Sequence, residues 1–340
     1  MTPVCPPETS QTKTPVLVLA GPTAVGKTAL SLHLSRQFDC EIVSMDSMQV
    51  YRFMDIGTAK ASIEERQLVP HHLIDIRNPD EQYDAAQFVR DATRAIQDIA
   101  HRGKIPLLTG GTGLYLSALI NGLFDQVEVS DQIRSSMKTR LREEGRERLH
   151  QELTRIDPES GARIHPNDTQ RIVRGLEIYY SSGVTWTQHL HQQARENRVA
   201  ALPDMLLIGL HCERAVLNER IQLRTSQMMS EAFAQEVHQL LDKGYEPSLP
   251  SMQAIGYRHM LNYLADKWTL AEATEILIKD TRHYAKRQMT WFRKYANMNW
   301  YPNDKPEKIA FDIDGFLCSR RFIFTSSPEG TSCGDLKDND

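Results

Sequence analysis

Hydrophobic residues gather in short runs along this chain, and these runs predict buried strands. Each run has five to eight residues bounded by glycine or polar side chains, which is typical of the strands of a parallel sheet. The runs lie at 16–20, 41–45, 72–76, 105–109 and 205–212. Apolar residues at helical spacing lie between several of them, for example from Ala85 to Ile99. Strands alternating with helices predict an α/β fold, with a parallel sheet covered by helices on both faces.

The strand pattern disappears in the middle of the chain and is replaced by helical spacing. Helices are predicted at 131–149 and 169–182, then at 213–242, 253–264 and 270–297. Asn167-Asp168 is suited to cap the second helix and Gly183 to end it. An all-helical block inside an α/β domain predicts an insertion domain.

These patterns divide the chain into five parts. We expect a disordered leader at 1–14, a first part of the core at 15–120, a helical insertion at 121–200, a second part of the core with a long basic helix at 201–302, and a partly disordered acidic tail at 303–340.

A phosphate-binding motif follows the first strand. The stretch has the pattern G-x-x-x-x-G-K-[ST] between a predicted strand and a predicted helix, which is the setting of a P-loop of the NTPase type. Backbone N–H groups, the helix N-terminus and the lysine would bind a diphosphate or nucleotide, and the threonine hydroxyl would bind Mg²⁺. The motif consists of Gly21, Pro22, Thr23, Ala24, Val25, Gly26, Lys27 and Thr28.

Other polar residues follow neighbouring strands, so they are expected at the same edge of the sheet. Asp46 follows the second run, where a carboxylate acts as a metal ligand, a general base or only a turn cap. Gly110–Thr112 follows the fourth run and offers backbone N–H groups and a hydroxyl. Arg220 and Arg224 lie four residues apart, either facing this edge or on a solvated helix face.

Charge distribution brings nucleic acid into consideration. The net charge is −4, but −3 of it lies from Asp304 onward, and Arg282–Lys294 holds five basic residues and no acid. A basic patch, rather than the total, sets the local attraction to phosphates. Further basic positions are Arg134, Lys138 and Arg142, and Arg171 with Arg174.

The location of the protein is indicated by what the sequence lacks. No apolar run is long enough for a membrane span, and the first 14 residues lack the apolar core of a signal peptide. Five scattered cysteines without CxxC spacing favour reduced thiols. We therefore expect a cytoplasmic protein without a membrane partner.

Taken together, the motifs resemble those of the tRNA dimethylallyltransferases, also called tRNA isopentenyltransferases. The resemblance covers about 16–300 and is closest to the bacterial type, which has no zinc finger. Departures are Val25, Met48-Gln49 and Gly113, where the family often has other residues. The matching stretches are 21–23, 46–47, 51–52, 54–60, 71–75, 110–112, 114–115, 165–168, 255–258 and 286–293.

The resemblance implies transfer of a dimethylallyl group from dimethylallyl diphosphate to N6 of the adenosine just 3′ of the anticodon, in tRNAs that read codons beginning with U. It implies that Asp46 accepts the N6 proton, that Thr23 and Thr112 lie close to the reacting groups, and that Arg224 steadies the diphosphate. Mg²⁺, bound through Thr28, is the implied cofactor. The partners are the tRNA anticodon stem-loop and dimethylallyl diphosphate, and we expect a monomer.

The resemblance also assigns residues that contact tRNA. They lie on the sheet edge, in the helical insertion and on the long basic helix. These residues are Asp46, Ser47, Met48, Gln49, Thr112, Arg134, Gln170, Arg171, Ile172, Val173, Arg174, Gln253, Ala254, Ile255, Gly256, Tyr257, Arg258, Lys286, Arg287, Gln288, Met289, Thr290, Trp291, Phe292 and Arg293.

Three other functions stay open at this point. A P-loop small-molecule kinase would turn over ATP, but it leaves the helical insertion and the basic aromatic helix unexplained. An adenylate isopentenyltransferase, which prenylates free AMP or ADP, would need no surface to hold an anticodon loop. A non-catalytic tRNA-binding protein would not need Lys27, Thr28 and Asp46 together.

Overall fold

The computed structural model describes residues 14–122, 127–196 and 204–325. The chain divides into two compact units, one formed by Met1–Leu116 with Leu202–Asp340 and the other by Ser117–Ala201. Apart from Thr14, the predicted leader lies outside the described residues, as does the predicted tail after Thr325.

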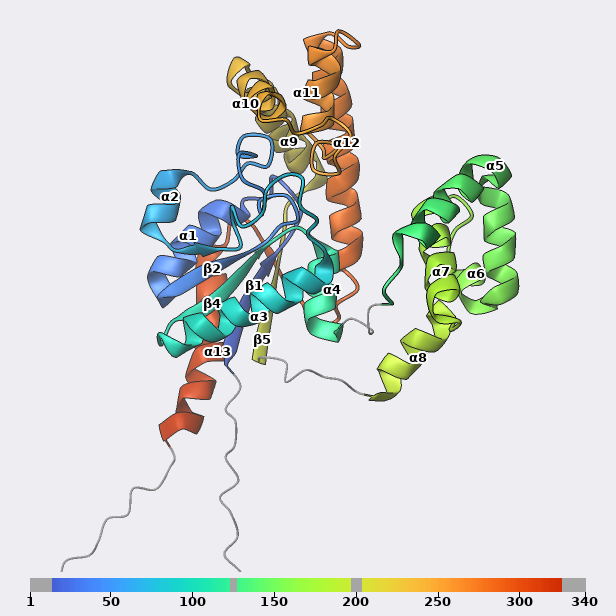
Figure 1. Cartoon of the computed structure of the whole chain (residues 1–340). Coiled ribbons are helices and arrows are strands. Elements are labelled where there is room, and N and C mark those ends of the chain that lie inside the picture. Colours follow the sequence, from blue (N-terminus) through green and yellow to red (C-terminus); the bar gives the residue numbers. More distant parts are fainter. Residues whose placement is uncertain (1–13, 123–126, 197–203, 326–340) are drawn as a thin grey trace, which may run out of the picture. The chain divides into compact units, whose positions relative to one another are not determined.

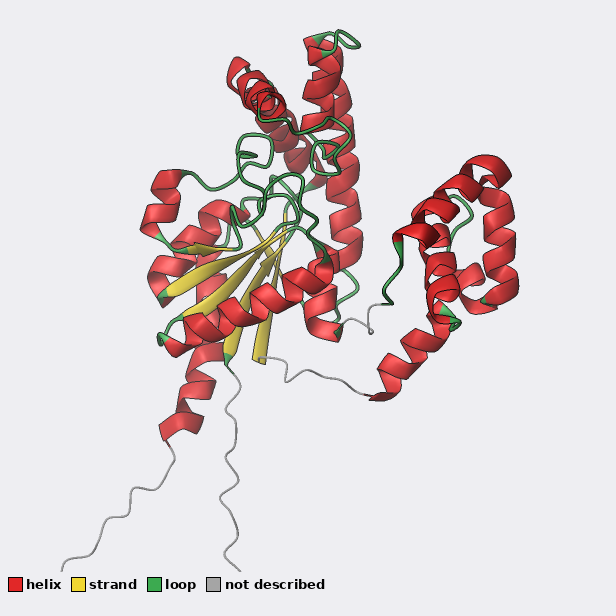
Figure 2. Cartoon of the chain, in the orientation of Figure 1, coloured by secondary structure: helices red, strands yellow, loops and turns green. Residues whose placement is uncertain are grey.

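A parallel sheet forms the centre of the first unit (Figure 2). Its strand order is β3-β2-β4-β1-β5-β6, and every neighbouring pair is parallel. The predicted α/β parallel sheet is therefore confirmed. The strands are β1 (Pro15–Ala20), β2 (Cys40–Met45), β3 (His71–His72), β4 (Ile105–Gly110), β5 (Asp204–His211) and β6 (Asn299–Pro302).

Helices cover both faces of this sheet (Figure 1). On one face, α1 (Lys27–Phe38) and α13 (Pro306–Thr325) pack with alternate strand residues such as Leu17 and Leu19 into one apolar core. On the other face lies α3 (Ala85–His101), which buries Phe88, Ala92 and Ile96. The remaining helices near the strands are α2 (Ile63–Leu68) and α4 (Gly113–Asn121).

Four helices form a second apolar core in the same unit: α9 (Arg214–Met228), α10 (Glu231–Asp242), α11 (Tyr257–Leu264) and α12 (Leu270–Phe292). Phe233, Tyr257 and Leu277 are fully buried there. Glu236 fixes the loop beneath them, because its carboxylate accepts hydrogen bonds from the backbone N–H groups of 55, 56 and 57 and from the Tyr257 hydroxyl.

The second unit is helical throughout its described part. It consists of α5 (Asp131–Ile156), α6 (Pro158–Arg163), α7 (Thr169–Ser182) and α8 (Trp186–Glu196). Its core holds Met137, Leu149, Leu153, Ile164, Ile172 and Leu176. The predicted caps are present, since Asp168 accepts the N–H of Arg171 and Gly183 ends α7 in the left-handed region.

Several predicted elements differ from the structure: the helix predicted at 270–297 ends at Phe292, and the helix predicted at 131–149 continues to Ile156. The strand predicted at 72–76 ends at His72, because Leu73 and Asp75 have positive φ angles, which an extended strand does not allow. The helix predicted at 213–242 breaks at Met229 and Ser230 into α9 and α10. The helix predicted at 253–264 begins only at Tyr257, after Gly256 with φ of 101°.

The first part of the segment predicted as an acidic tail forms helix α13, which packs into the core next to strand β6. Strand β6 extends the sheet, and in α13 the side chains of Ile309, Ile313 and Leu317 pack into the same apolar cluster as β1. The acidic composition concealed the helical pattern: Glu307 and Asp314 are exposed and Asp312 accepts the Tyr301 hydroxyl, while the apolar residues of α13 recur at helical spacing.

Candidate active site at the carboxyl edge of the sheet

The P-loop connects β1 to α1 at the carboxyl edge of the sheet. Gly26 caps α1 with φ of 108°, a conformation that favours glycine. The α1 N-terminus carries no acidic residue in its first turn, so its partial positive charge is free to attract an anion. Both features suit a phosphate group at Gly21–Thr28.

Side chains from distant parts of the chain hold this loop in place. The Val25 carbonyl accepts hydrogen bonds from Arg220 at 3.3 Å and from Asn303 at 2.9 Å. The Gln288 amide oxygen accepts the N–H of Thr23 at 2.9 Å, while its nitrogen donates to the Gly111 carbonyl at 3.0 Å. Gln288 therefore ties the P-loop to the loop after β4, and Gly111 allows this because a β-carbon there would lie 2.1 Å from the amide nitrogen.

The register of the strands brings the predicted edge residues together. Gly110 pairs with both Ala20 and Met45, so the loops that follow β1, β2 and β4 start side by side. A cavity of about 420 Å³ lies among them. Its lining includes Thr23, Lys27, Thr28, Asp46, Gly111 and Arg224.

Asp46 occupies the turn after β2. Its Oδ1 accepts the N–H groups of Met48 at 2.8 Å and Gln49 at 3.3 Å, so it caps this turn. No hydrogen bond to Oδ2 occurs among the residues that the structure describes. The next N–H, of Ser47, donates to the Thr112 hydroxyl at 3.1 Å. One carboxylate oxygen thus fixes the loop while the other is left for a ligand in the cavity.

Two cations face Asp46 across the cavity. Lys27 Nζ donates to the carbonyls of Gly21 at 2.9 Å and Pro22 at 2.8 Å. Burial lowers the pKa of Lys27 to about 8; Asp46 opposes this shift and Arg224 adds to it. The Arg224 guanidinium donates to the Thr23 hydroxyl at 3.4 Å, and desolvation by the surrounding cavity likewise lowers the pKa of Arg224, although part of its surface is exposed. An anion between the two cations would relieve their desolvation and mutual repulsion.

A second, more apolar cavity of about 260 Å³ adjoins the first. The two cavities share Thr23, Asp46, Arg224 and Tyr284 in their linings. The apolar part of the second is made by Met48, Ile221, Met228, Ile255 and Leu277. A ligand with a charged end and a small apolar end fits across the pair.

Tyr284 is a site residue that the sequence analysis missed. It lines both cavities, and burial, followed by the charge of Asp46, raises its pKa, while Thr112 and Gln288 oppose the shift. The sequence does show that Tyr284 lies four residues before Gln288, so the two share one face of the helix. Spacing alone, however, does not tell which face of α12 meets the sheet edge.

The predicted tRNA-contacting stretches of the first unit differ in exposure. On α12, Lys286, Arg287, Thr290 and Arg293 are exposed, Met289 and Trp291 are half-buried, and Gln288 and Phe292 are buried. In the stretch 253–258, Gln253 is exposed and Ala254, Ile255 and Arg258 are half-buried, whereas Gly256 and Tyr257 are buried. The buried residues of these two stretches are not available to a partner in this structure, and they support the fold around the site.

The predicted contacts of the helical unit are also mixed. Arg134, Gln170 and Arg171 are exposed, and Arg171 pairs with Asp168 at 3.1 Å. Arg174 and Val173 are half-buried, while Ile172 lies in the core of this unit. Arg134 likewise lies 3.9 Å from Asp131, so both exposed arginines have an acidic neighbour, and Ile172 contributes to the fold of the unit rather than to its surface.

The residues present fit a Mg²⁺ ion next to a diphosphate. Thr28 and Asp46 place oxygen donors in the same cavity as Lys27. Mg²⁺ prefers a few protein oxygens, completed by water and substrate phosphates. Among the described residues, no group of three or more His, Cys, Asp or Glu side chains is placed to hold a metal on its own. Nor is any described helix both long and apolar enough to span a bilayer.

Fold and site define an α/β protein of the P-loop type whose anion site opens onto an apolar pocket. The model of the IPP transferase family matches residues 49–295. The chain belongs to this family.

Individual relatives are similar to this chain over most of its length. A tRNA dimethylallyltransferase of Desulfotalea psychrophila is 51% identical over 90% of this chain and 96% of its own length. The crystal structure of a tRNA isopentenylpyrophosphate transferase from Bacillus halodurans is 39% identical, with a TM-score of 0.66, over 92% of this chain and 99% of its own. A eukaryotic dimethylallyltransferase acting on tRNA is 28% identical, with a TM-score of 0.73, over 94% of this chain and 81% of its own.

Proposed function

We propose that this protein transfers a dimethylallyl group from dimethylallyl diphosphate to tRNA. The acceptor is N6 of the adenosine 3′-adjacent to the anticodon, in tRNAs that read codons beginning with U. The products are N6-(dimethylallyl)adenosine in tRNA and diphosphate. The names and high identity of the relatives support tRNA as the acceptor.

One structural observation carries this proposal: the apolar cavity opens directly onto the P-loop cavity, with Asp46 in the lining of both. A phosphoryl-transfer site needs room for a second polar substrate at the end of the phosphates. Here that position is lined by Ile221, Met228 and Leu277, which suit a prenyl chain and the face of a flipped purine.

The chemistry follows from charge and position. The bond between C1 and the diphosphate oxygen breaks, and its electron pair leaves with the diphosphate. The N6 lone pair forms the new C–N bond, and the N6 proton passes to the free oxygen of Asp46. Lys27 and Arg224 stabilise the negative charge that grows on the diphosphate. Thr23 lines both cavities and is held by Arg224 and Gln288, and the Thr112 hydroxyl accepts the N–H of Ser47, next to Asp46; we assign both threonines to positions near the reacting groups.

Mg²⁺ is part of the proposal. Thr28 would hold it, with Asp46 in the same cavity. When bound, the ion would add positive charge to the leaving diphosphate.

An assay that compares different acceptor substrates tests this function against its alternatives. The protein is incubated with Mg²⁺ and dimethylallyl diphosphate, and diphosphate release is measured with tRNA, with AMP, or with neither. We expect release that depends on tRNA. Release with AMP alone would indicate an adenylate isopentenyltransferase. A separate incubation with ATP and no prenyl donor tests the third possibility, because turnover of ATP there would indicate a kinase.

A further inference from the structure

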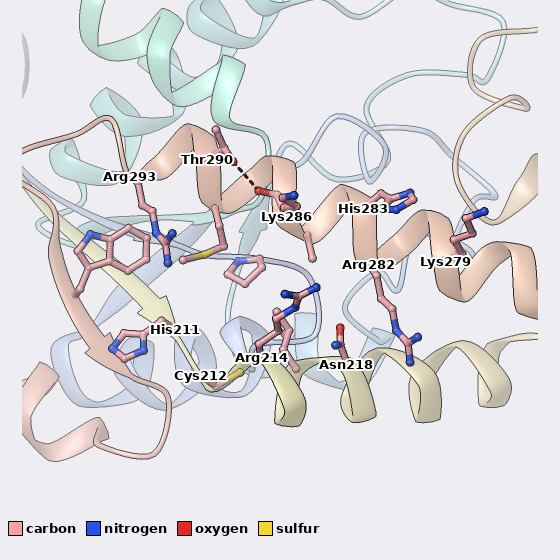
Figure 3. Close-up of a pocket in the computed structure, with 15 residues that line it drawn as sticks. His211, Cys212, Arg214, Asn218, Lys279, Arg282, His283, Lys286, Thr290 and Arg293 are labelled. Atoms are coloured by element: carbon pink, nitrogen blue, oxygen red, sulfur yellow. Dashed lines mark hydrogen bonds between the residues drawn. The ribbon is translucent and has the colours of Figure 1, made fainter.

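A large groove lies in the first unit, on the opposite side of α12 from the P-loop cavity. Its volume is about 770 Å³. Figure 3 shows Arg214 and Asn218 on α9 below and Lys279, Arg282, Lys286 and Arg293 along α12 above. His211 at the end of β5 and Trp300 of β6 close one end.

The two faces of α12 serve different cavities. Tyr284 and Gln288 point to the P-loop cavity. Arg282, Lys286 and Arg293 follow another stripe of the helix and line the groove. The groove therefore shares the helix with the proposed active site but has its own lining, apart from Pro22 at the back of the P-loop.

The groove is strongly positive. Five Arg and Lys side chains and two histidines line it, and no Asp or Glu does so. The acid next to Lys279, Asp280, is turned away and pairs with Arg258 and His259. Arg282 reaches from α12 toward α9, where it donates to Gln222 at 3.3 Å, and its buried Nε has no hydrogen-bond partner in the described part of the chain. Cations held together without counter-charges repel each other unless an anion neutralises them.

We propose that this groove binds the sugar-phosphate backbone of the RNA substrate, outside the nucleoside that reacts. The contact extends beyond the segment 286–293 to Arg214 on α9 and to Lys279 and Arg282 on the first half of α12. The proposal rests on tRNA being the substrate. It gives the first unit two separate phosphate sites, the P-loop for the diphosphate and the groove for the RNA chain.

The length of the groove favours a strand over a free nucleotide. From Lys279 to Arg293 the helix rises about 21 Å, at about 1.5 Å per residue. The cations are spread along this whole length, whereas a mononucleotide would need them clustered around one phosphate chain. Trp300 and His211 at the end, with ring centroids 6.4 Å apart, offer apolar surface on which an unpaired base can stack.

The test compares two doubly substituted proteins with the same change in charge. The groove variant is Arg214→Ala with Lys279→Ala. The control is Arg94→Ala with Lys308→Ala, two exposed cations on α3 and α13 that do not line the groove. Binding of an unmodified tRNA transcript is measured from 50 to 300 mM salt, and binding of inorganic diphosphate with Mg²⁺ is measured separately.

We expect the groove variant to bind the transcript about tenfold more weakly near 100 mM salt, and its salt slope to fall by about 1 per lost phosphate contact. The control should keep at least most of the wild-type affinity and slope. Restoring charge with Arg214→Lys and Lys279→Arg should restore most of the affinity. Diphosphate affinity should be the same in all proteins.

Three results would overturn the proposal. The groove variant could match the control in tRNA affinity and salt slope. It could lose diphosphate affinity, which would make the groove part of the P-loop site. It could lose binding of ATP, measured with the P-loop saturated by diphosphate, while tRNA binding is unchanged; the groove would then hold a free nucleotide. None of these measurements requires prenyl transfer, so failure of the proposed reaction would be seen separately.

Discussion

At the residue scale, the two carboxylate oxygens of Asp46 have different surroundings. Oδ1 caps the turn through Met48 and Gln49, and Oδ2 is left to accept a proton. The sequence analysis treated cap and base as alternatives, and the geometry allows both at once. Whether the carboxylate is also the base stays a prediction.

Replacing Asp46 with Asn tests that role. The amide oxygen keeps the cap, so fold and tRNA affinity should persist, but an amide is no proton acceptor. We expect the single-turnover rate of prenyl transfer to fall by about 10² to 10⁴-fold, the usual contribution of a general base. An unchanged rate would remove Asp46 from the base role.

Lys27 should make diphosphate binding depend on pH. Its pKa of about 8 in the free protein should rise when the anion binds, so binding takes up a proton. Dimethylallyl diphosphate should therefore bind more weakly as pH rises through about 8, by up to about tenfold per pH unit. Calorimetry in two buffers of different ionisation enthalpy measures the proton uptake. Lys27→Ala is the control for the titration of the ligand itself, and equal uptake in both proteins would contradict the prediction.

At the scale of elements, α12 acts as the support of the P-loop. Gln288→Leu keeps the approximate volume but leaves the Thr23 N–H and the Gly111 carbonyl without their partner. Such losses cost about 1 to 3 kcal/mol each when the groups stay buried. We expect weaker diphosphate binding, measured by calorimetry. Gln239→Leu on the exposed side of α10 is the matched control, and equal affinities in the two variants would show that Gln288 does not support the loop.

Helix α13 should contribute to stability although its composition resembles a tail. Ile313 is fully buried against the sheet, while Phe311 in the same helix is 79% exposed. Ile313→Ala should lower the free energy of unfolding by about 2 to 5 kcal/mol, and Phe311→Ala should change it little. Urea unfolding measures both. Equal midpoints would mean that the helix does not pack as described.

The elements that the sequence predicted well are those with strong local signals. The runs at 16–20 and 105–109 correspond to β1 and β4. Asp168 caps the N-terminus of α7 and Gly183 its C-terminus, as their capping chemistry requires. The convergence of Asp46 and the P-loop follows from parallel topology. Tyr284 and β6 could not be found this way, because their positions depend on contacts between segments far apart in sequence.

At the scale of the whole molecule, the two compact units divide the features that the proposed function needs. The first holds the P-loop, the apolar pocket and the basic groove. The second is a helical unit with exposed cations on α5 and α7. A small-molecule kinase would use the first cavity alone, whereas a macromolecular substrate gives the remaining basic surfaces a purpose.

The most direct test is the mass of the nucleosides in treated tRNA. An unmodified transcript with adenosine 3′ of its anticodon is incubated with the protein, Mg²⁺ and dimethylallyl diphosphate, then digested and analysed by mass spectrometry. The account predicts one dimethylallyl group on N6 of that adenosine, and none when a transcript carries another base there. An unmodified adenosine, with the prenyl group found instead on free AMP or not transferred at all, would contradict it.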